Sequence, residues 1–600
     1  MRRFLFLMIL LCLAVSFVLT QKPSKAPPKH SKVTELGYRV YQPFRLSPDG
    51  RYLSYEDEDG DIFFVRDLKS GEDHPIPDSG NDAFTFLSQG KKIALDWGNA
   101  PPPTFSRNAQ SLISLFHDWS PDHKYVAATF LRRDLTYQFG LVSVSDGSVR
   151  ILKTQAFKTM NWSFQRVEAR FSPDGRFLAY DLAPQGGWYP RDIFAVPVEG
   201  GPEIPLVENP ANDLLFGWTP DGKTVLFLSD RSGGWDLWAV PLIDGRSSHG
   251  PPARVMPNFG VNAGVGFTRD GSYFYTVLAR ESDLYVTAID PATRRVRTPE
   301  KLLSHTGWNT SVEWSRDGQY LAYASGIGSE YEPFVLGIRS ALTGKERQFR
   351  LDKLMRHGGH GFEPRWSPDG RFILATARER DYAGPLVDSQ GLYRIDVQTG
   401  RVTPLVQTTA ICGSNCIESP LWSPDGRVIF KRRVTESIVT RDLETGEEKE
   451  LYRAVPPAFV VHWPTSNLAI SPDGQRLAFV QIDAKAGITT LNVIPMTGGE
   501  ARELLRAYRP EVVSVPAWMP DSRQIIYAHS VAGEKRQFEL WRTSTAGGEP
   551  QRLGLTMEGL QPYGLSVHPD GRRIAFTAGR PPHSELWVMK NFPPSLETAK

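Results

Sequence analysis

Short stretches in which apolar and polar residues alternate run through almost the whole chain. Residues 176–180 and 319–323 are two of them, and such alternation is typical of half-buried β-strands. The phrase apolar or aromatic residue, Ser or Thr, Pro, Asp, Gly precedes many of these stretches, as at 171–175. Because Pro presets φ and Asp and Gly favour tight turns, the pattern predicts strands joined in antiparallel pairs.

The turn phrase recurs at a nearly constant spacing. Eleven copies place their Asp at positions 49, 122, 174, 221, 270, 317, 369, 425, 473, 521 and 570. From residue 122 onward the interval is 47 to 56 residues, and a degenerate copy at 86–90 brings the number of repeats to twelve. A third strand, as at 236–241, a Gly-containing turn and a short fourth strand complete each repeat. The sequence therefore predicts an all-β fold of tandem β-propellers, with about twelve four-stranded blades.

These repeats resemble the TolB-type, WD40-like propeller repeat of exported bacterial proteins. The match is carried by Trp-Ser-Pro-Asp-Gly-Arg at 366–371 and by Ser-Asp-Arg…Asp-Leu-Trp at 229–238, and it covers about residues 36–590. The resemblance implies the fold and contacts with envelope proteins. Propellers host many unrelated activities, so it says little about the function of this chain.

Twelve blades exceed the usual size of one ring, which predicts two rings of six. We place the first propeller at residues 33–304 and the second at 305–592, followed by a tail at 593–600; a division into five plus seven stays open. Residues 33–40 are expected to complete the sixth blade and residues 296–303 the twelfth.

The N-terminus resembles an export signal. A basic start is followed by an apolar run that ends at residue 19, so we assign residues 1–20 to a signal peptide or an uncleaved signal anchor, and 21–32 to a linker. The expected location is periplasmic or secreted, with membrane contact only through such an anchor. Lys plus Arg number 69 against 67 for Asp plus Glu, which argues against nucleic acid as a partner.

The sequence contains no known catalytic motif. Gly-x-Ser-x-Gly, the P-loop and His-Glu-x-x-His do not occur, and the repeats leave no segment for the hydrolase domain that accompanies the propeller of prolyl oligopeptidase-type peptidases. We therefore predict no catalytic residues and no cofactor.

Two short motifs offer other chemistry. Cys412 and Cys416 are the two cysteines of the mature chain and are expected to form a disulfide in an oxidising compartment, with a redox-active pair as the alternative. His357 and His360 are weak candidates for metal binding, because two ligands do not make a site. A Gly-rich turn is the expected role of this second motif.

Two long loops between second and third strands, 181–191 and 377–391, are the expected binding surfaces, because loops on a rigid scaffold concentrate binding residues. Their aromatic and basic side chains are Trp188, Tyr189, Arg191, Arg378, Arg380 and Tyr382. The alternative is that the loops merely cover blade edges.

The sequence favours an exported, non-enzymatic propeller scaffold that binds a protein or peptide of the cell envelope through its loop faces. One alternative is a metal-assisted hydrolase or lyase using His357, His360 and Asn309. Another is a glycan-binding surface protein with Trp188 and Trp235 as platforms.

Overall fold

The computed structural model describes residues 29–590 except for internal gaps, of which the longest are 77–84, 94–110, 157–167, 327–333, 356–362, 380–389 and 409–416. Every regular element in the described part is a β-strand, and this part holds no helix that could cross a membrane. The predicted all-β class of tandem propeller blades is confirmed. The signal expected at 1–20 and the tail at 593–600 lie outside the described residues.

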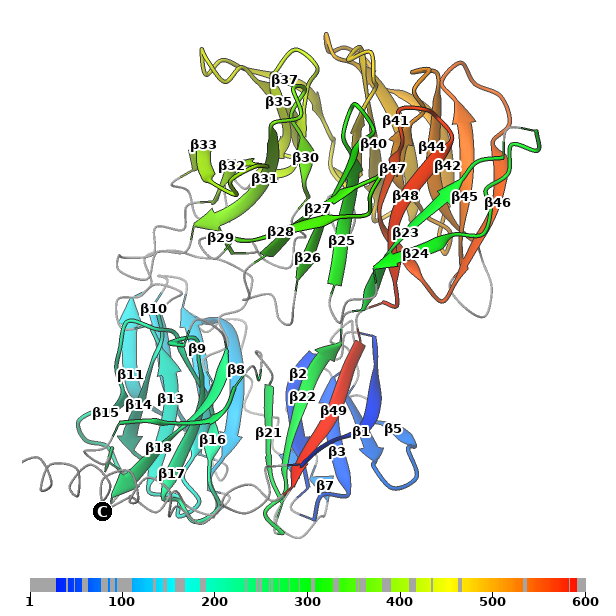
Figure 1. Cartoon of the computed structure of the whole chain (residues 1–600). Helices are drawn as coiled ribbons and strands as arrows, with labels where there is room; N and C mark the ends of the chain where they lie inside the picture. Colours follow the sequence, from blue (N-terminus) through cyan, green and yellow to red (C-terminus); the bar gives the residue numbers. More distant parts are fainter. Residues whose placement is uncertain are drawn as a thin grey trace, which may run out of the picture.

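The sheets form two groups, which we call the first ring and the second ring, drawn in the lower and upper halves of Figure 1. The sheets of the first ring contain, in order, β2 (Tyr41–Leu46), β3 (Tyr52–Glu56), β4 (Phe63–Asp67) and β5 (Asp73–Ile76); β6 (Thr85–Phe86) and β7 (Lys92–Ile93); β8 (Ser111–Trp119), β9 (Tyr125–Arg132), β10 (Thr136–Ser143) and β11 (Val149–Ala156); β12 (Ala169–Phe171), β13 (Phe177–Leu182), β14 (Asp192–Pro197) and β15 (Ile204–Val207); β16 (Asp213–Trp218), β17 (Thr224–Ser229), β18 (Asp236–Ile243), β19 (Arg246–Ser247) and β20 (Ala253–Met256); β21 (Ala263–Phe267), β22 (Tyr273–Ala279), β49 (His583–Lys590) and β1 (Lys29–Tyr38).

The sheets of the second ring contain β25 (Trp308–Trp314), β26 (Tyr320–Gly326), β27 (Phe334–Ser340) and β28 (Glu346–Leu351); β29 (Leu354–Met355), β30 (Arg365–Trp366), β31 (Phe372–Glu379), β32 (Gln390–Asp396) and β33 (Val402–Thr408); β34 (Ile417–Trp422), β35 (Val428–Arg432), β36 (Ser437–Arg441) and β37 (Glu448–Arg453); β38 (Ala458–Val460), β39 (Leu468–Ile470), β40 (Arg476–Asp483), β41 (Ile488–Pro495) and β42 (Arg502–Tyr508); β43 (Val513–Trp518), β44 (Gln524–Val531), β45 (Gln537–Ser544) and β46 (Gln551–Glu558); β47 (Gln561–Val567), β48 (Arg573–Gly579), β23 (Ser282–Ala288) and β24 (Glu300–Leu303). The first and the last of these groups are joined into one eight-stranded sheet by a parallel pairing of β23 with β25 at Ser282 and Trp308.

The recurring turn phrase forms the same hydrogen-bonded turn in sheet after sheet. At 172–175, Ser172 Oγ donates to Asp174 Oδ1 (2.6 Å), the Phe177 N–H donates to Ser172 Oγ (3.0 Å), and Gly175 has φ +72°. The Asp therefore satisfies hydrogen-bonding groups of the turn, as the sequence predicts. In the turn at Asp49, bonds from the Ser47 hydroxyl and the backbone lower the pKa of the carboxyl.

The fourth strand of most sheets carries a bulge at an apolar residue. Opposite β14, Val207 pairs with Ile193 and Pro205 pairs with Phe194, which leaves Leu206 as the extra, buried residue. The same shift occurs in β37 and β42. Its consequence is that polar residues three positions apart on an outer strand lie on the same face.

The aromatic residue before the turn phrase joins neighbouring sheets. The indole Nε1 of Trp218 donates to Arg170 O (3.0 Å), Trp366 donates to Glu313 O (3.1 Å) and Trp518 donates to Ala469 O (2.9 Å). Because each of these carbonyls belongs to the preceding sheet, these three indoles each tie two consecutive blades together; the Nε1 atoms of Trp314 and Trp422 make no such bond among the described residues.

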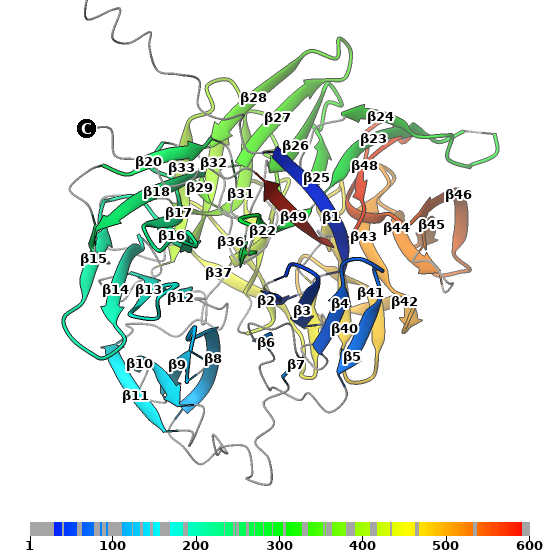
Figure 2. The ribbon, with the colours of Figure 1, turned by 90° about the horizontal axis from the view of Figure 1, so that it is seen from below.

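The first strands of the second ring contact one another in succession, from β25 through β30, β34, β39 and β43 to β47, which contacts β25 again. In the first ring the contacts run from β8 through β12, β16 and β21 to β2, with β6 beside β2. Figure 2 shows the sheets arranged around a central region. The described contacts close the second ring over six first strands; because residues 94–110 lie outside the description, the count for the first ring and the division into six plus six stay predictions.

Two strands are exchanged between the rings. The chain leaves β22 at Ala279 in the first ring and enters β23 at Ser282 in the second; later it leaves β48 at Gly579 in the second ring and returns to the first as β49. The two crossings run side by side, since a Cβ at Gly579 would lie 1.9 Å from Glu281 O. Glycine is therefore required at this position.

The exchange differs from the contiguous domains expected at 33–304 and 305–592. Residues 282–303 belong to a sheet of the second ring, and residues 583–590 belong to a sheet of the first. The two third-strand phrases, Ser-Asp-Leu-Tyr-Val at 282–286 and Ser-Glu-Leu-Trp-Val at 584–588, are nearly the same, so local pattern does not assign them to a ring. β1 and β24 do complete the predicted sheets, although β1 begins at Lys29, inside the expected linker 21–32.

Both crossings replace the connection between the second and third strands of a blade. In a propeller this connection lies on the same face of every blade, together with the loops that lead from each fourth strand to the next first strand. The loop faces of the two rings are therefore turned toward each other, joined along one side by the crossings (Figure 1).

Candidate functional site

The loop face of the first ring carries a network of buried charged side chains between the sheets of β12–β15 and β16–β20. At its centre, Arg191 Nη1 lies 2.9 Å from Asp181 Oδ1, and the two side chains are 8% and 1% exposed. Asp181 also accepts backbone bonds from Leu215 N (2.9 Å) and Glu168 N (3.2 Å). One carboxylate therefore ties the end of β13 to the next sheet, and an ion pair this well bonded holds its charges in fixed positions.

A second pair extends the network along the loop face. Arg231 Nη2 lies 2.8 Å from the fully buried Asp213 Oδ1, whose other oxygen accepts a bond from Asn209 Nδ2. Asp230 Oδ1 accepts the Asn212 N–H (3.0 Å). The Ser-Asp-Arg phrase of the repeat thus serves as a turn contact and an ion pair.

Asp192 and Asp181 are the two carboxyls of this network whose pKa burial raises to about 6. At Asp192 the Asn209 N–H opposes the pKa shift, and the nearby carboxylates of Asp213 and Glu208 add to it. A buried carboxyl with a shifted pKa beside other charged groups is a feature of functional surfaces, although ion-pair networks of structural origin share it.

The guanidinium group of Arg170 lies among the first strands of this ring. Arg170 donates from Nη1 to His117 O (3.1 Å) in β8 and from Nη2 to Gly264 O (3.2 Å) in β21, with the Glu168 carboxylate at 3.3 Å. Beside it, the Phe171 N–H donates to Asp118 Oδ2 (2.8 Å). These contacts join three sheets.

The second ring repeats the arrangement. Glu313 accepts the Trp366 N–H (2.5 Å), and Arg365 lies 3.5 Å from Glu363. The pattern Glu-x-Arg-aromatic-Ser-Pro-Asp-Gly occurs at both 168–175 and 363–370, so the sequence holds a signal for these residues that the repeat analysis missed.

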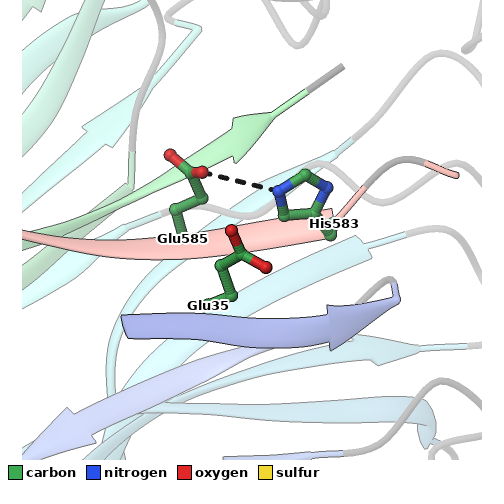
Figure 3. Close-up of side chains that lie close together, drawn as sticks. All are labelled: Glu35, His583 and Glu585. Carbon is green, nitrogen blue, oxygen red and sulfur yellow. Dashed lines mark ion pairs between the residues drawn. The ribbon is translucent and has the colours of Figure 1, made fainter. Parts of the chain in front are cut away.

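A cluster of possible metal ligands lies where the two ends of the described chain pair. Glu35 of β1 and His583 and Glu585 of β49 bring their ligand atoms within 4.8 Å of one another (Figure 3). The Lys32 ammonium, however, lies 2.6 Å from Glu35 Oε1 and 2.5 Å from Glu585 Oε1. These bonds raise the pKa of Lys32, and its ammonium group already contacts both carboxylates that an ion would need. The cluster is therefore an ion-pair clasp between β1 and β49.

Most of the residues singled out from the sequence lie outside the described part of the chain. These are Trp188, Tyr189, His357, His360, Arg380, Tyr382, Cys412 and Cys416. Arg378 lies in β31, paired with Gln390 of β32, but its side chain is not described.

The described residues change three expectations. Arg191 is buried and ion-paired, which does not suit an exposed anchor. Trp235 is 2% exposed, so it offers no platform to a glycan. Asn309, expected as a polar group of an enzyme site, is fully buried and donates from Nδ2 to Ser282 O (2.7 Å), next to one of the crossings.

No family model matches the chain. Among curated proteins it is similar to dipeptidyl-peptidase 5 of Porphyromonas gingivalis, with 23% identity over 44% of this chain and 44% of that protein. It is also similar to the uncharacterized protein Atu1656 of Agrobacterium fabrum (24% identity, 42% of this chain, 80% of that protein) and to the uncharacterized peptidase YuxL of Bacillus subtilis (24% identity, 35% and 29%). The chain thus spans less than half of each of the two peptidase relatives.

Solved structures similar to the chain include TolB from Acinetobacter baumannii, at 18% identity over 51% of this chain and 66% of that chain, with a TM-score of 0.32. Oligogalacturonate lyase from Vibrio parahaemolyticus covers 70% of this chain and 96% of its own at 13% identity, with a TM-score of 0.34.

Proposed function

We propose that the protein is an exported binding protein that holds a protein or peptide partner between the loop faces of its two rings. The strand exchange is the observation that carries the proposal. Because both crossings lie on one side of the molecule, the loop faces are turned toward each other at a distance that the crossings limit. Loops on two rigid scaffolds then form opposite walls of a single binding region.

The charges of the first ring support a polypeptide ligand. Arg231, whose side chain is 20% exposed, and the exposed Glu208 lie at the loop face, above the buried ion pairs Arg231–Asp213 and Arg191–Asp181. Fixed charges of both signs complement the backbone and the charged side chains of a polypeptide and set its orientation more than its affinity. The names of two curated relatives, a dipeptidyl-peptidase and a peptidase, point to the same ligand class.

Site-specific photocrosslinking in the native envelope tests the proposal. Benzoylphenylalanine is introduced at Glu208 in the first ring and at Val455 in the second, both exposed and both at loop-face ends of their sheets. Leu342 is the matched control, because it is 93% exposed but lies in the turn between β27 and β28, on the opposite face of the second ring.

We expect the same partner to crosslink to both loop-face positions and not to Leu342. Equal crosslinking from Leu342 would refute a binding region between the rings. Absence of adducts from Glu208 and Val455, together with turnover of a peptide panel by the purified protein, would replace the binding function by an enzymatic one.

A further inference from the structure

A groove of about 680 Å³ lies in the second ring, between the outer strand β37 and the neighbouring sheet of β38, β40, β41 and β42. This volume falls in the usual range of small-molecule sites. Along β41 the groove extends from Ile488 to Asn492, four strand steps or about 13 Å. It is thus an elongated slot at the rim of the ring, outside the region between the rings.

Two matching ion pairs flank the groove. Arg453 donates from Nε and Nη2 to the two oxygens of Glu450 (3.0 and 2.5 Å), and Arg506 donates in the same way to Glu503 (2.9 and 2.7 Å). Each pair joins residues three apart on a fourth strand, which the bulges of β37 and β42 bring to one face. The forks are therefore held flat, with their remaining donors and acceptors in fixed positions.

The floor of the groove consists of amide and hydroxyl groups. Asn492 Nδ2 donates to Thr490 Oγ1 (2.8 Å), and the Tyr452 hydroxyl donates to Gln481 Oε1. Both Asn492 and Thr490 are at most 9% exposed. Within the described residues the Asn492 Oδ1 and Gln481 Nε2 atoms make no hydrogen bond to protein, so an acceptor and an amide donor of the groove lining are available to a ligand.

An aromatic side chain stands at one end of the groove. Tyr508 lies two positions after Arg506 on β42, hence on the same face of the sheet, and is 60% exposed. Across the sheet Tyr508 pairs with Ile488, which in turn pairs with Asp483, and both of these residues line the groove. A large exposed ring beside fixed polar groups provides a flat platform on which a ligand can stack.

We propose that this groove binds a short oligosaccharide. Sugar hydroxyls both donate and accept, and vicinal hydroxyls match the paired oxygens and nitrogens of the Glu–Arg forks, while the faces of sugar rings stack on an aromatic side chain. Apart from Leu451 and Ile488 the apolar lining residues are few and small, so the groove offers a ligand mainly polar partners. The proposal does not depend on the partner proposed between the rings.

Isothermal titration of the purified full chain with chitotriose, cellotriose and maltotriose tests the site. Asn492→Leu keeps the volume of a buried side chain but removes its polar atoms, and Tyr508→Ala removes the platform from an exposed position where folding tolerates change. Tyr320→Ala is the matched control, because Tyr320 is a part-exposed tyrosine of β26 in another sheet of the same ring.

We expect at least one of the trisaccharides to bind, with affinity at least tenfold weaker in both groove variants and unchanged in Tyr320→Ala. Binding that neither groove variant weakens would place the sugar elsewhere and overturn the proposal. The proposal would also be overturned if none of the three sugars bound. It would be overturned too if the groove bound trilysine instead of a sugar, through the carboxylates of Asp483 and Glu500.

Discussion

Because of the strand exchange, two leucines pack in the core of a ring to which their positions in the sequence do not assign them. Leu586 lies near the C-terminus in β49 and is fully buried in the first ring, against Leu53 and Phe274. Leu284 lies in β23 before most of the second ring and is fully buried there, against Trp314 and its neighbours. Each Leu→Ala change should destabilise the ring that packs the side chain.

The expected size follows from burial. Both side chains are 0% exposed, and truncation of a fully buried leucine removes its transfer free energy and leaves a cavity, at a cost of about 2–5 kcal/mol. If the loss is confined to one ring, amide protection there falls at least about 30-fold, since about 1.4 kcal/mol is a factor of ten.

Hydrogen exchange followed by mass spectrometry locates the loss. Leu586→Ala is expected to speed exchange in peptides from β21 and β22 and to leave β47 and β48 protected; Leu284→Ala is expected to do the reverse. If Leu586→Ala acted on β47 and β48, or if both variants gave one and the same pattern, the assignment of strands to rings would be refuted.

Three further predictions concern single groups. Burial raises the pKa of Asp192 to about 6, so the protonated carboxyl stabilises the folded state fully below about pH 4, and this stabilisation is lost as pH rises through 6. In urea titrations the free energy of unfolding of the natural chain should therefore fall by on the order of 2 kcal/mol between pH 4 and pH 7 through this group, and Asp192→Asn should abolish that part of the fall. The same pH profile in both proteins would contradict the burial of the carboxyl. Lys32→Met should open the Glu35–Glu585 clasp to an ion, so that Zn²⁺ raises the melting temperature of the variant and not of the natural chain; an equal rise in both would show that Lys32 does not exclude metal. For a chain that starts at residue 21, thiol titration in denaturant should find no free thiol before reduction and two after it, from Cys412 and Cys416; two free thiols before reduction would exclude the disulfide.

The fold was largely accessible from sequence because its signals are local. The turn phrase, as at 172–175, places its hydrogen bonds within a few residues, and the alternation that follows specifies a strand whatever lies beside it. Open blades at the two ends also predicted which segments must close them, and β1 and β24 occupy those sheets. Repetition at a fixed spacing was enough for this level of structure.

The candidate sites were less accessible, because they depend on which distant residues meet. Arg191 is an exposed-looking loop residue in the sequence, yet Asp181 on the preceding strand buries its guanidinium. The groove arises from two Glu–Arg pairs whose members share a face only because bulges shift the register of β37 and β42. Neither the ion-pair partner nor the bulge has a signal at the residue itself.

The sequence alone determined a chain of four-stranded units with a fixed turn, because those features rest on contacts within one repeat. The tertiary structure alone decided that the strands at 282–288 and 583–590 change places, and with them that the two loop faces are turned toward each other. The physical reason is that the two strands carry nearly the same pattern of apolar residues. Either would satisfy the hydrogen bonds of either sheet, and only the long-range packing of their side chains selects between the rings.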